Sequence, residues 1–197
     1  LTGALGASPT TALAATKAAR PVASYDGSNY VVAWEDYRTG LVLSGVPVDN
    51  VYAARVTAAG SVLDSAGVVV DNESFSALRQ LRPAIASSPT GSLLLWEQEN
   101  LTKLSPLAIQ GARFNADGSA PDVNAGFVVS RSSNAQDSPA VAFDGTGYLL
   151  VWEDYRNLLG SNGLPECAIY GALVSQTGAL SASFPIPIDG EPGCGNG

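Results

Sequence analysis

Short apolar runs bounded by turn residues dominate the chain. In its C-terminal part the runs read PAVAFD, GYLLVWED, AIYGALVS and SFPIPID, and Gly, Asp, Asn and Ser separate them. They are rich in Val, Ile, Tyr, Phe and Trp, a composition typical of β-strands. The DG and TG pairs between runs favour tight hairpins, because glycine adopts positive φ without steric cost. No window shows a convincing 3.6-residue apolar stripe, so the pattern predicts an all-β protein.

The same pattern occurs three times along the chain. Each copy has a Pro followed by an apolar pair, a Trp thirteen residues after the Pro, and a Glu directly after the Trp. The prolines lie 62 and 56 residues apart. These anchor positions are Pro21, Pro83 and Pro139, then Trp34, Trp96 and Trp152, and then Glu35, Glu97 and Glu153. Four antiparallel strands per copy at this spacing predict β-propeller-like blades.

The blade interpretation divides the whole chain. TGALGASP near the N-terminus matches TGALSASFP near the C-terminus, which indicates one extra N-terminal strand. An immunoglobulin-like sandwich is the alternative fold, but it does not explain three equally placed Trp residues. The predicted parts are an orphan outer strand of a preceding repeat at 1–19, repeats at 20–81, 82–137 and 138–190, and a Gly-rich tail at 191–197.

These motifs resemble a known kind of repeat. The pattern DGxxYLVVWEDxR … IYGxRVSxxG is similar to the blades of large secreted or surface β-propeller repeat proteins of environmental bacteria, and the resemblance covers most of residues 20–190. It implies a secreted or cell-surface protein and says little about activity, because propellers host many functions. The middle copy departs from the pattern. It has WEQEN in place of WEDYR, and Gln110 stands where the other copies have Tyr52 and Tyr170.

The repeated acidic pair after each Trp raises the question of catalysis. On a strand, Glu35 and Asp36 point to opposite faces, whereas glycosidases need two carboxyl groups that converge on one bond. A structural role also explains why the motif recurs. We therefore expect the Trp side chains to fill the space between blades, and the acids, including Asp154, to hold turns and neighbouring strands. We expect Arg55 and Arg113 to pair with Glu35 and Glu97.

Composition limits the possible partners. The net charge of −8 argues against binding to nucleic acids or anionic membranes, because phosphates require Lys and Arg. No apolar run is long enough to predict a transmembrane helix. Only 14% of the residues are charged, against about 25% in a typical soluble domain. This low charge predicts that other subunits cover part of the surface, either head-to-tail or by closure of a dimer.

Other candidate chemistry is sparse. The chain has no His, which removes the commonest general base and metal ligand. We expect no metal site and no cofactor, although the Asp-rich turns near Asp71 and Asn115 leave calcium open. The two cysteines, Cys167 and Cys194, predict a disulfide in a secreted protein.

Three functional hypotheses follow. The first is a non-enzymatic structural protein, a subunit of an extracellular fibre or surface structure. The second is a glycan-binding, lectin-like module in which Tyr37 and Tyr155 stack on sugar rings. The third is an enzyme of the glycosidase or lyase type, which the placement of the carboxylates disfavours.

Overall fold

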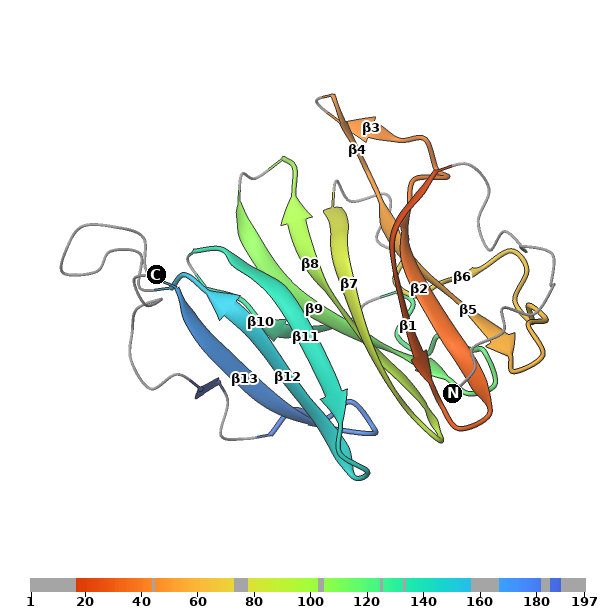
Figure 1. The fold of residues 1–197 in the computed structure, drawn as a ribbon. Helices are drawn as coiled ribbons and strands as arrows, with labels where there is room; N and C mark the ends of the chain where they lie inside the picture. Colours follow the sequence, from red (N-terminus) through yellow and green to blue (C-terminus); the bar gives the residue numbers. More distant parts are fainter. Residues whose placement is uncertain are drawn as a thin grey trace, which may run out of the picture.

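All regular secondary structure in the described part of the chain is β-strand (Figure 1). The computed structural model describes residues 17–43, 45–72, 78–102, 105–124, 126–132, 134–156, 167–181 and 185–188. The strands are β1 (Ala18–Tyr25), β2 (Asn29–Asp36), β3 (Val42–Leu43), β4 (Val46–Pro47), β5 (Asn50–Thr57), β6 (Val68–Val69), β7 (Leu78–Ser88), β8 (Gly91–Asn100), β9 (Ser105–Asn115), β10 (Phe127–Ser130), β11 (Gln136–Phe143), β12 (Gly147–Asp154), β13 (Ala168–Ser175) and β14 (Ile186–Pro187).

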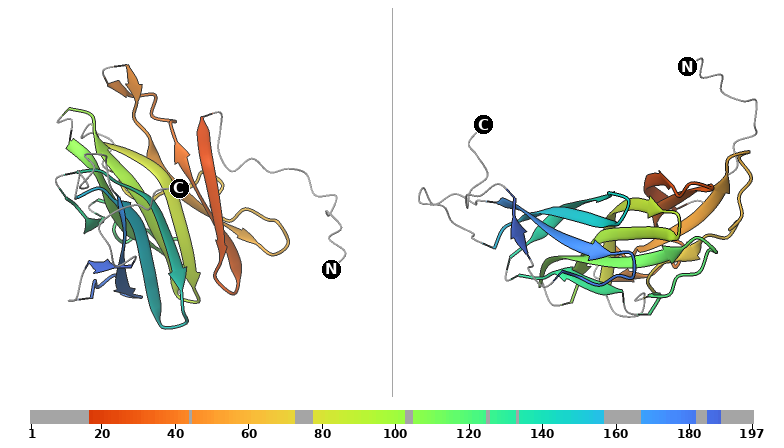
Figure 2. Two further views of the ribbon diagram at one scale, coloured as in Figure 1. Left: turned by 60° about the vertical axis from the view of Figure 1, so that its left-hand side comes forward. Right: turned by 90° about the horizontal axis from the view of Figure 1, so that it is seen from below.

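The strands form three four-stranded antiparallel sheets and one hairpin. Sheet I has the order β1-β2-β5-β6, sheet II the order β7-β8-β9-β10, and sheet III the order β11-β12-β13-β14. The hairpin β3–β4 is inserted between the second and third strands of sheet I. The three sheets follow one another side by side, and their first strands β1, β7 and β11 are neighbours (Figures 1 and 2).

Each first strand contains a bulge just before its proline. The register shifts between Ala19 and Val22 in β1, and the corresponding shifts occur in β7 and β11. The residue before the proline has positive φ in all three strands: 48° at Arg20, 49° at Arg82 and 52° at Ser138. Proline disfavours the right-handed helical region for the residue before it. The positive φ is costly for a residue with a Cβ, so three equal occurrences indicate that the surrounding structure imposes this backbone.

Two apolar clusters join the sheets. One lies between sheets I and II and includes Val31, Ala33, Leu94 and Trp96. The other lies between sheets II and III and includes Leu93, Leu95, Tyr148, Leu150 and Trp152. Sheet II is therefore covered on both faces, and its strand β8 is buried continuously from Gly91 to Gln98. This explains why the second strands read as continuous apolar runs.

The predicted all-β class is confirmed in the residues described, with four-stranded antiparallel sheets and no helix. Within the described ranges the sheets do not close into a propeller, and the hairpin β3–β4 adds a fourth, two-stranded sheet that the sequence did not predict. The proposed repeat boundaries stay predictions. Most of the predicted extra strand at 1–19, and the tail at 191–197, lie outside the described residues. No helix that could cross a membrane occurs in the described part of the chain.

Candidate functional site: carboxylates between the sheets

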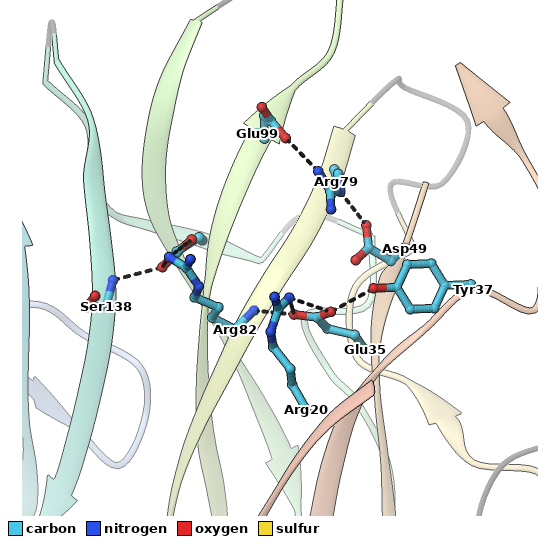
Figure 3. A network of polar contacts seen from close by, with 9 residues as sticks. Arg20, Glu35, Tyr37, Asp49, Arg79, Arg82, Glu99 and Ser138 are labelled. Atoms are coloured by element: carbon cyan, nitrogen blue, oxygen red, sulfur yellow. Dashed lines mark hydrogen bonds and ion pairs between the residues drawn. The ribbon is translucent and has the colours of Figure 1, made fainter. Parts of the chain in front are cut away.

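Glu35 connects sheet I to sheet II. It lies on β2 and is fully buried. Its Oε1 accepts the backbone N–H of Arg82, in strand β7 of sheet II, at 2.6 Å. Nη1 of Arg20, from β1 of the same sheet, donates to Oε1 at 2.8 Å, and the Tyr37 hydroxyl donates to Oε2 at 2.9 Å (Figure 3). Three donors surround this carboxylate, and one of them belongs to the next sheet.

Glu97 makes the same connection between sheets II and III. It is buried on β8, and its Oε1 accepts the backbone N–H of Ser138, in β11, at 2.8 Å. Nη1 of Arg82, from β7 of its own sheet, donates to the same oxygen at 3.1 Å. Burial raises the pKa of the Glu97 carboxyl, while the Ser138 N–H and the Arg82 guanidinium act in the opposite direction. We call each of these connections, a buried glutamate that accepts a backbone N–H of the next sheet, a joint. Arg82 takes part in both joints, because its backbone N–H donates to Glu35 and its side chain donates to Glu97.

Glu153 occupies the matching position on β12 of sheet III but has different surroundings. It is only half-buried, and the Tyr155 hydroxyl donates to its Oε2 at 3.1 Å. Burial, together with the nearby charge of Glu153, raises the pKa of the Asp137 carboxyl. Within the described part of the chain, no backbone N–H from another sheet donates to Glu153. Glu153 therefore occupies the same position in its sheet as Glu35 and Glu97, but in the ranges described it does not accept a backbone N–H from a neighbouring sheet as they do.

The aspartate of the WED motif has a separate role inside its own sheet. Asp36 accepts the Trp34 indole N–H at 2.8 Å and Nε of Arg38 at 2.8 Å. Burial opposes ionisation of Asp36, but the bonds from Arg38 and Trp34 outweigh it and lower its pKa. The Arg38 guanidinium also lies over the ring of Tyr52, 4.0 Å from its centroid.

Sheet III repeats this cluster with the same four residue types. Asp154 accepts the indole N–H of Trp152 at 3.0 Å and Nε of Arg156 at 2.9 Å, and the Arg156 guanidinium lies 4.2 Å from the ring centroid of Tyr170. In sheet II the Trp96 indole instead donates to Oε1 of Gln98 at 3.1 Å. The acid, the arginine and the tyrosine are therefore replaced together in the middle copy.

The expected pairing of Arg55 and Arg113 with Glu35 and Glu97 is wrong. Arg55 pairs with Asp64, nine residues later, at 2.8 Å. Arg113 pairs in the same way with Asp122 at 2.6 Å. Glu35 and Glu97 instead receive their guanidinium groups from Arg20 and Arg82, the arginines before the prolines, which lie at the bulges of β1 and β7.

Asp49 is a second buried carboxylate near Glu35. It is buried directly before β5, and Nε of Arg79 donates to its Oδ1 at 3.2 Å. Burial raises the pKa of Asp49 to about 6, against the opposing charge of Arg79. Nη1 of Arg79 also donates to Glu99 at 3.3 Å (Figure 3). Burial and the hydrogen bond to Glu35 raise the pKa of Tyr37 to about 12.

The two tyrosines considered for glycan contact are both half-buried and both donate to a glutamate, Tyr37 to Glu35 and Tyr155 to Glu153. Their hydroxyl groups are therefore used within the protein. Tyr37 also borders a cavity of about 310 Å³ that is lined by Lys17, Leu41 and Val42 among others.

The joints are poorly suited to chemistry on a substrate. Glu35 and Glu97 are buried, and their oxygens accept hydrogen bonds from neighbouring strands. In the ranges that the structure describes, no group of three or more His, Cys, Asp or Glu side chains is arranged to hold a metal ion.

Of the two cysteines in the predicted disulfide, only Cys167 lies within the described residues. Cys167 is buried and is not a free thiol. Cys194 lies outside the described residues, so the Cys167–Cys194 bridge stays a prediction.

Comparisons with known proteins show no family. No protein-family model and no curated protein matches the chain. A solved structure described as a glycosyl hydrolase from Bacteroides ovatus is 12% identical, with a TM-score of 0.42. The match covers 84% of this chain and 51% of that one, so the chain spans about half the length of that protein. A similarity this low carries no argument about fold or activity.

Proposed function

We propose that this protein is a non-enzymatic structural protein, a secreted building block of an extracellular fibre or surface structure made of β-propeller-like blades. The observation that carries the proposal is the use of the repeated glutamate. Glu35 and Glu97, the acids that a catalytic interpretation of the WED motif would require, are buried and accept backbone N–H groups of the next sheet. In these two copies the glutamate of the motif therefore connects neighbouring sheets.

The composition and the clusters support the same role. The low fraction of charged residues suits a protein that is largely covered by neighbours. Trp96 and Trp152 lie in the two apolar clusters between sheets, which is where a structural repeat needs large apolar side chains.

Substitution of Glu97 separates structure from catalysis. Glu97→Gln keeps an oxygen that accepts the Ser138 N–H, whereas Glu97→Ala removes it. The structural role predicts a larger stability loss in the alanine variant and no hydrolysis of aryl glycosides by the native protein. Glycoside hydrolysis by native protein that disappears in a folded Glu97→Gln variant would refute the proposal.

A second candidate function is glycan binding near Tyr37. The observation in its favour is the cavity of about 310 Å³ beside this ring. A glycan array with native protein and with a Leu41→Ser variant tests it, because Leu41 lines the cavity and is exposed. Binding that the variant loses would favour this function, and an array without signal would exclude the tested glycans.

A further inference from the structure

The two outer sheets present the two halves of a joint that the chain already makes twice. In each internal joint, one sheet contributes a buried glutamate and the next sheet contributes the N–H of the residue before its proline. Sheet III presents the glutamate half through Glu153, and sheet I presents the N–H half through Arg20, which has the same positive φ as Arg82 and Ser138.

The outward side of sheet III, which we call the glutamate face, consists of Leu149, Val151, Glu153 and Leu173. Strand alternation places these residues opposite to Leu150 and Trp152, which pack against sheet II. Leu149 is 40% exposed and Leu173 is 48% exposed. In sheet II, the position of Leu149 is taken by Leu93, which is buried against sheet III. The glutamate face thus has the residues of an internal joint, but Leu149 and Leu173 on it are not covered by a neighbouring sheet among the described residues.

The outward side of sheet I, which we call the tyrosine face, includes the exposed Tyr25 and Tyr30 and the half-buried Val32, and Trp34 lies beside them on β2 with 3% of its surface exposed. Tyr25 and Tyr30 face each other across β1 and β2, with ring centroids 5.1 Å apart and an interplanar angle of 48°. Phe143 and Tyr148 form the same pair in sheet III, with centroids 5.0 Å apart and an angle of 45°. The pair in sheet III packs against sheet II, whereas Tyr25 and Tyr30 are 49% and 48% exposed.

A hydroxyl contact completes the correspondence. The Tyr148 hydroxyl donates to the carbonyl oxygen of Gly91, the first residue of β8, at 3.1 Å. Tyr30 has the position of Tyr148 in its own sheet, four residues before the Trp. Gly147 has the position of Gly91, as the first residue of β12. The tyrosine face therefore carries the counterparts of the residues with which sheet III contacts sheet II, and the glutamate face carries the counterparts of the residues with which sheet II contacts sheet III.

From this match we infer that a second copy of the chain docks head-to-tail, with its tyrosine face on the glutamate face of the first copy. Glu153 of one copy accepts the Arg20 N–H of the next, and the Tyr25–Tyr30 pair covers Leu149. The inference rests on the proposed structural function, because it uses the internal joints as the template. Such a contact is heterologous, so it builds a ring if its rotation closes and a filament if it does not.

The test uses one charge on each face of the full chain. Tyr30→Lys disables the tyrosine face, Leu149→Lys disables the glutamate face, and Val128→Lys is the control, since Val128 is 44% exposed on the outer strand of the middle sheet. Light scattering should show native and control chains associating as concentration rises. Each single-face variant should stay monomeric, and an equimolar mixture of the two should form a dimer through its one intact joint.

Substitution of Glu153 tests the proposed hydrogen bond separately, through the strength of association. Glu153→Ala should weaken association about tenfold or more, because it removes the acceptor of a charge-assisted hydrogen bond, and Glu153→Gln should weaken it less. A native chain that stays monomeric at all concentrations, or single-face variants that still associate, would overturn the inference. If Glu97→Ala lowers stability in that same monomer, the proposed structural role stands and only the docking contact fails.

Discussion

The backbone N–H of Arg82 donates to Oε1 of Glu35 at 2.6 Å, from one sheet to the next. A side chain of one sheet therefore depends on the backbone geometry of its neighbour, and that geometry is a positive-φ bulge held before a proline. The joint is satisfied only when both sheets are formed. This dependence is the basis of the stability predictions that follow.

Replacing Glu97 with alanine should lower the free energy of unfolding by about 1–3 kcal/mol, because the Ser138 N–H loses its acceptor. Urea unfolding at pH 7 measures the loss. Glu99→Ala is the control, since Glu99 makes a more exposed ion pair at 3.3 Å and should cost less than about 1 kcal/mol. Equal losses in the two variants would contradict the role of the buried joint.

Trp152→Ala should lower the free energy of unfolding by about 3–5 kcal/mol, because the indole is 1% exposed and packs in the cluster between sheets II and III. Thermal and urea unfolding both report it. Val128→Ala, on an exposed position, should change stability by less than about 1 kcal/mol. A tolerated Trp152→Ala would show that the ring does not support the stack.

Ser138→Gly should leave stability unchanged or raise it by up to about 1 kcal/mol, because φ is 52° at Ser138 and glycine adopts this region without strain. Ser138→Val should instead lower stability by about 1–2 kcal/mol, since a β-branched side chain suits positive φ poorly. Differential scanning calorimetry of the pair measures both signs. The opposite order would mean that the bulge relaxes in solution.

Asp49 should make stability fall as pH rises from about 4 to 7. Its pKa of about 6 in the fold lies above its ordinary value near 3.9, so its contribution is fully present below the ordinary pKa. That contribution is lost as pH rises through 6. Asp49→Asn should therefore gain stability relative to native protein across this range, as measured by urea unfolding at several pH values.

Asp64 should have the opposite effect on the pH dependence of stability, which Asp64→Asn tests. The hydrogen bond from Arg55 lowers the pKa of Asp64, so its contribution is present above the ordinary pKa and lost as pH falls. The variant should be less stable than native protein at pH 7 and should approach it at low pH. If Asp49→Asn behaves like Asp64→Asn, the burial of Asp49 does not control its charge.

The Cys167–Cys194 bridge should be detectable in protein purified without reductant. Its closure of about 27 residues should contribute about 3 kcal/mol in the chain-entropy description. Native mass should be two hydrogens below that of the reduced chain. Alkylation of both thiols without reductant would disprove the bridge.

The sequence predicts the strands well, because the Pro-to-Trp spacing and the DG turns are local signals. It did not predict the partners of Glu35 and Glu97. A donor from the backbone of another sheet leaves no trace in residue type, since both Arg82 and Ser138 supply it equally. One signal was available for the side chains. Arginine precedes the proline in the first two copies. The pairing of Arg55 with Asp64 was harder to predict, because the two residues lie nine positions apart on opposite sides of a turn.

Sheet II has a neighbour on each face, whereas sheets I and III have one each among the described residues. In a stack with nearest-neighbour coupling, opening an outer sheet breaks one contact and opening the middle sheet breaks two. Amide protons of β8 should therefore exchange with solvent last, and those of β2 and β12 earlier. We therefore expect the three sheets to open at different rates, with the slowest opening in the copy whose sequence departs most from the other two.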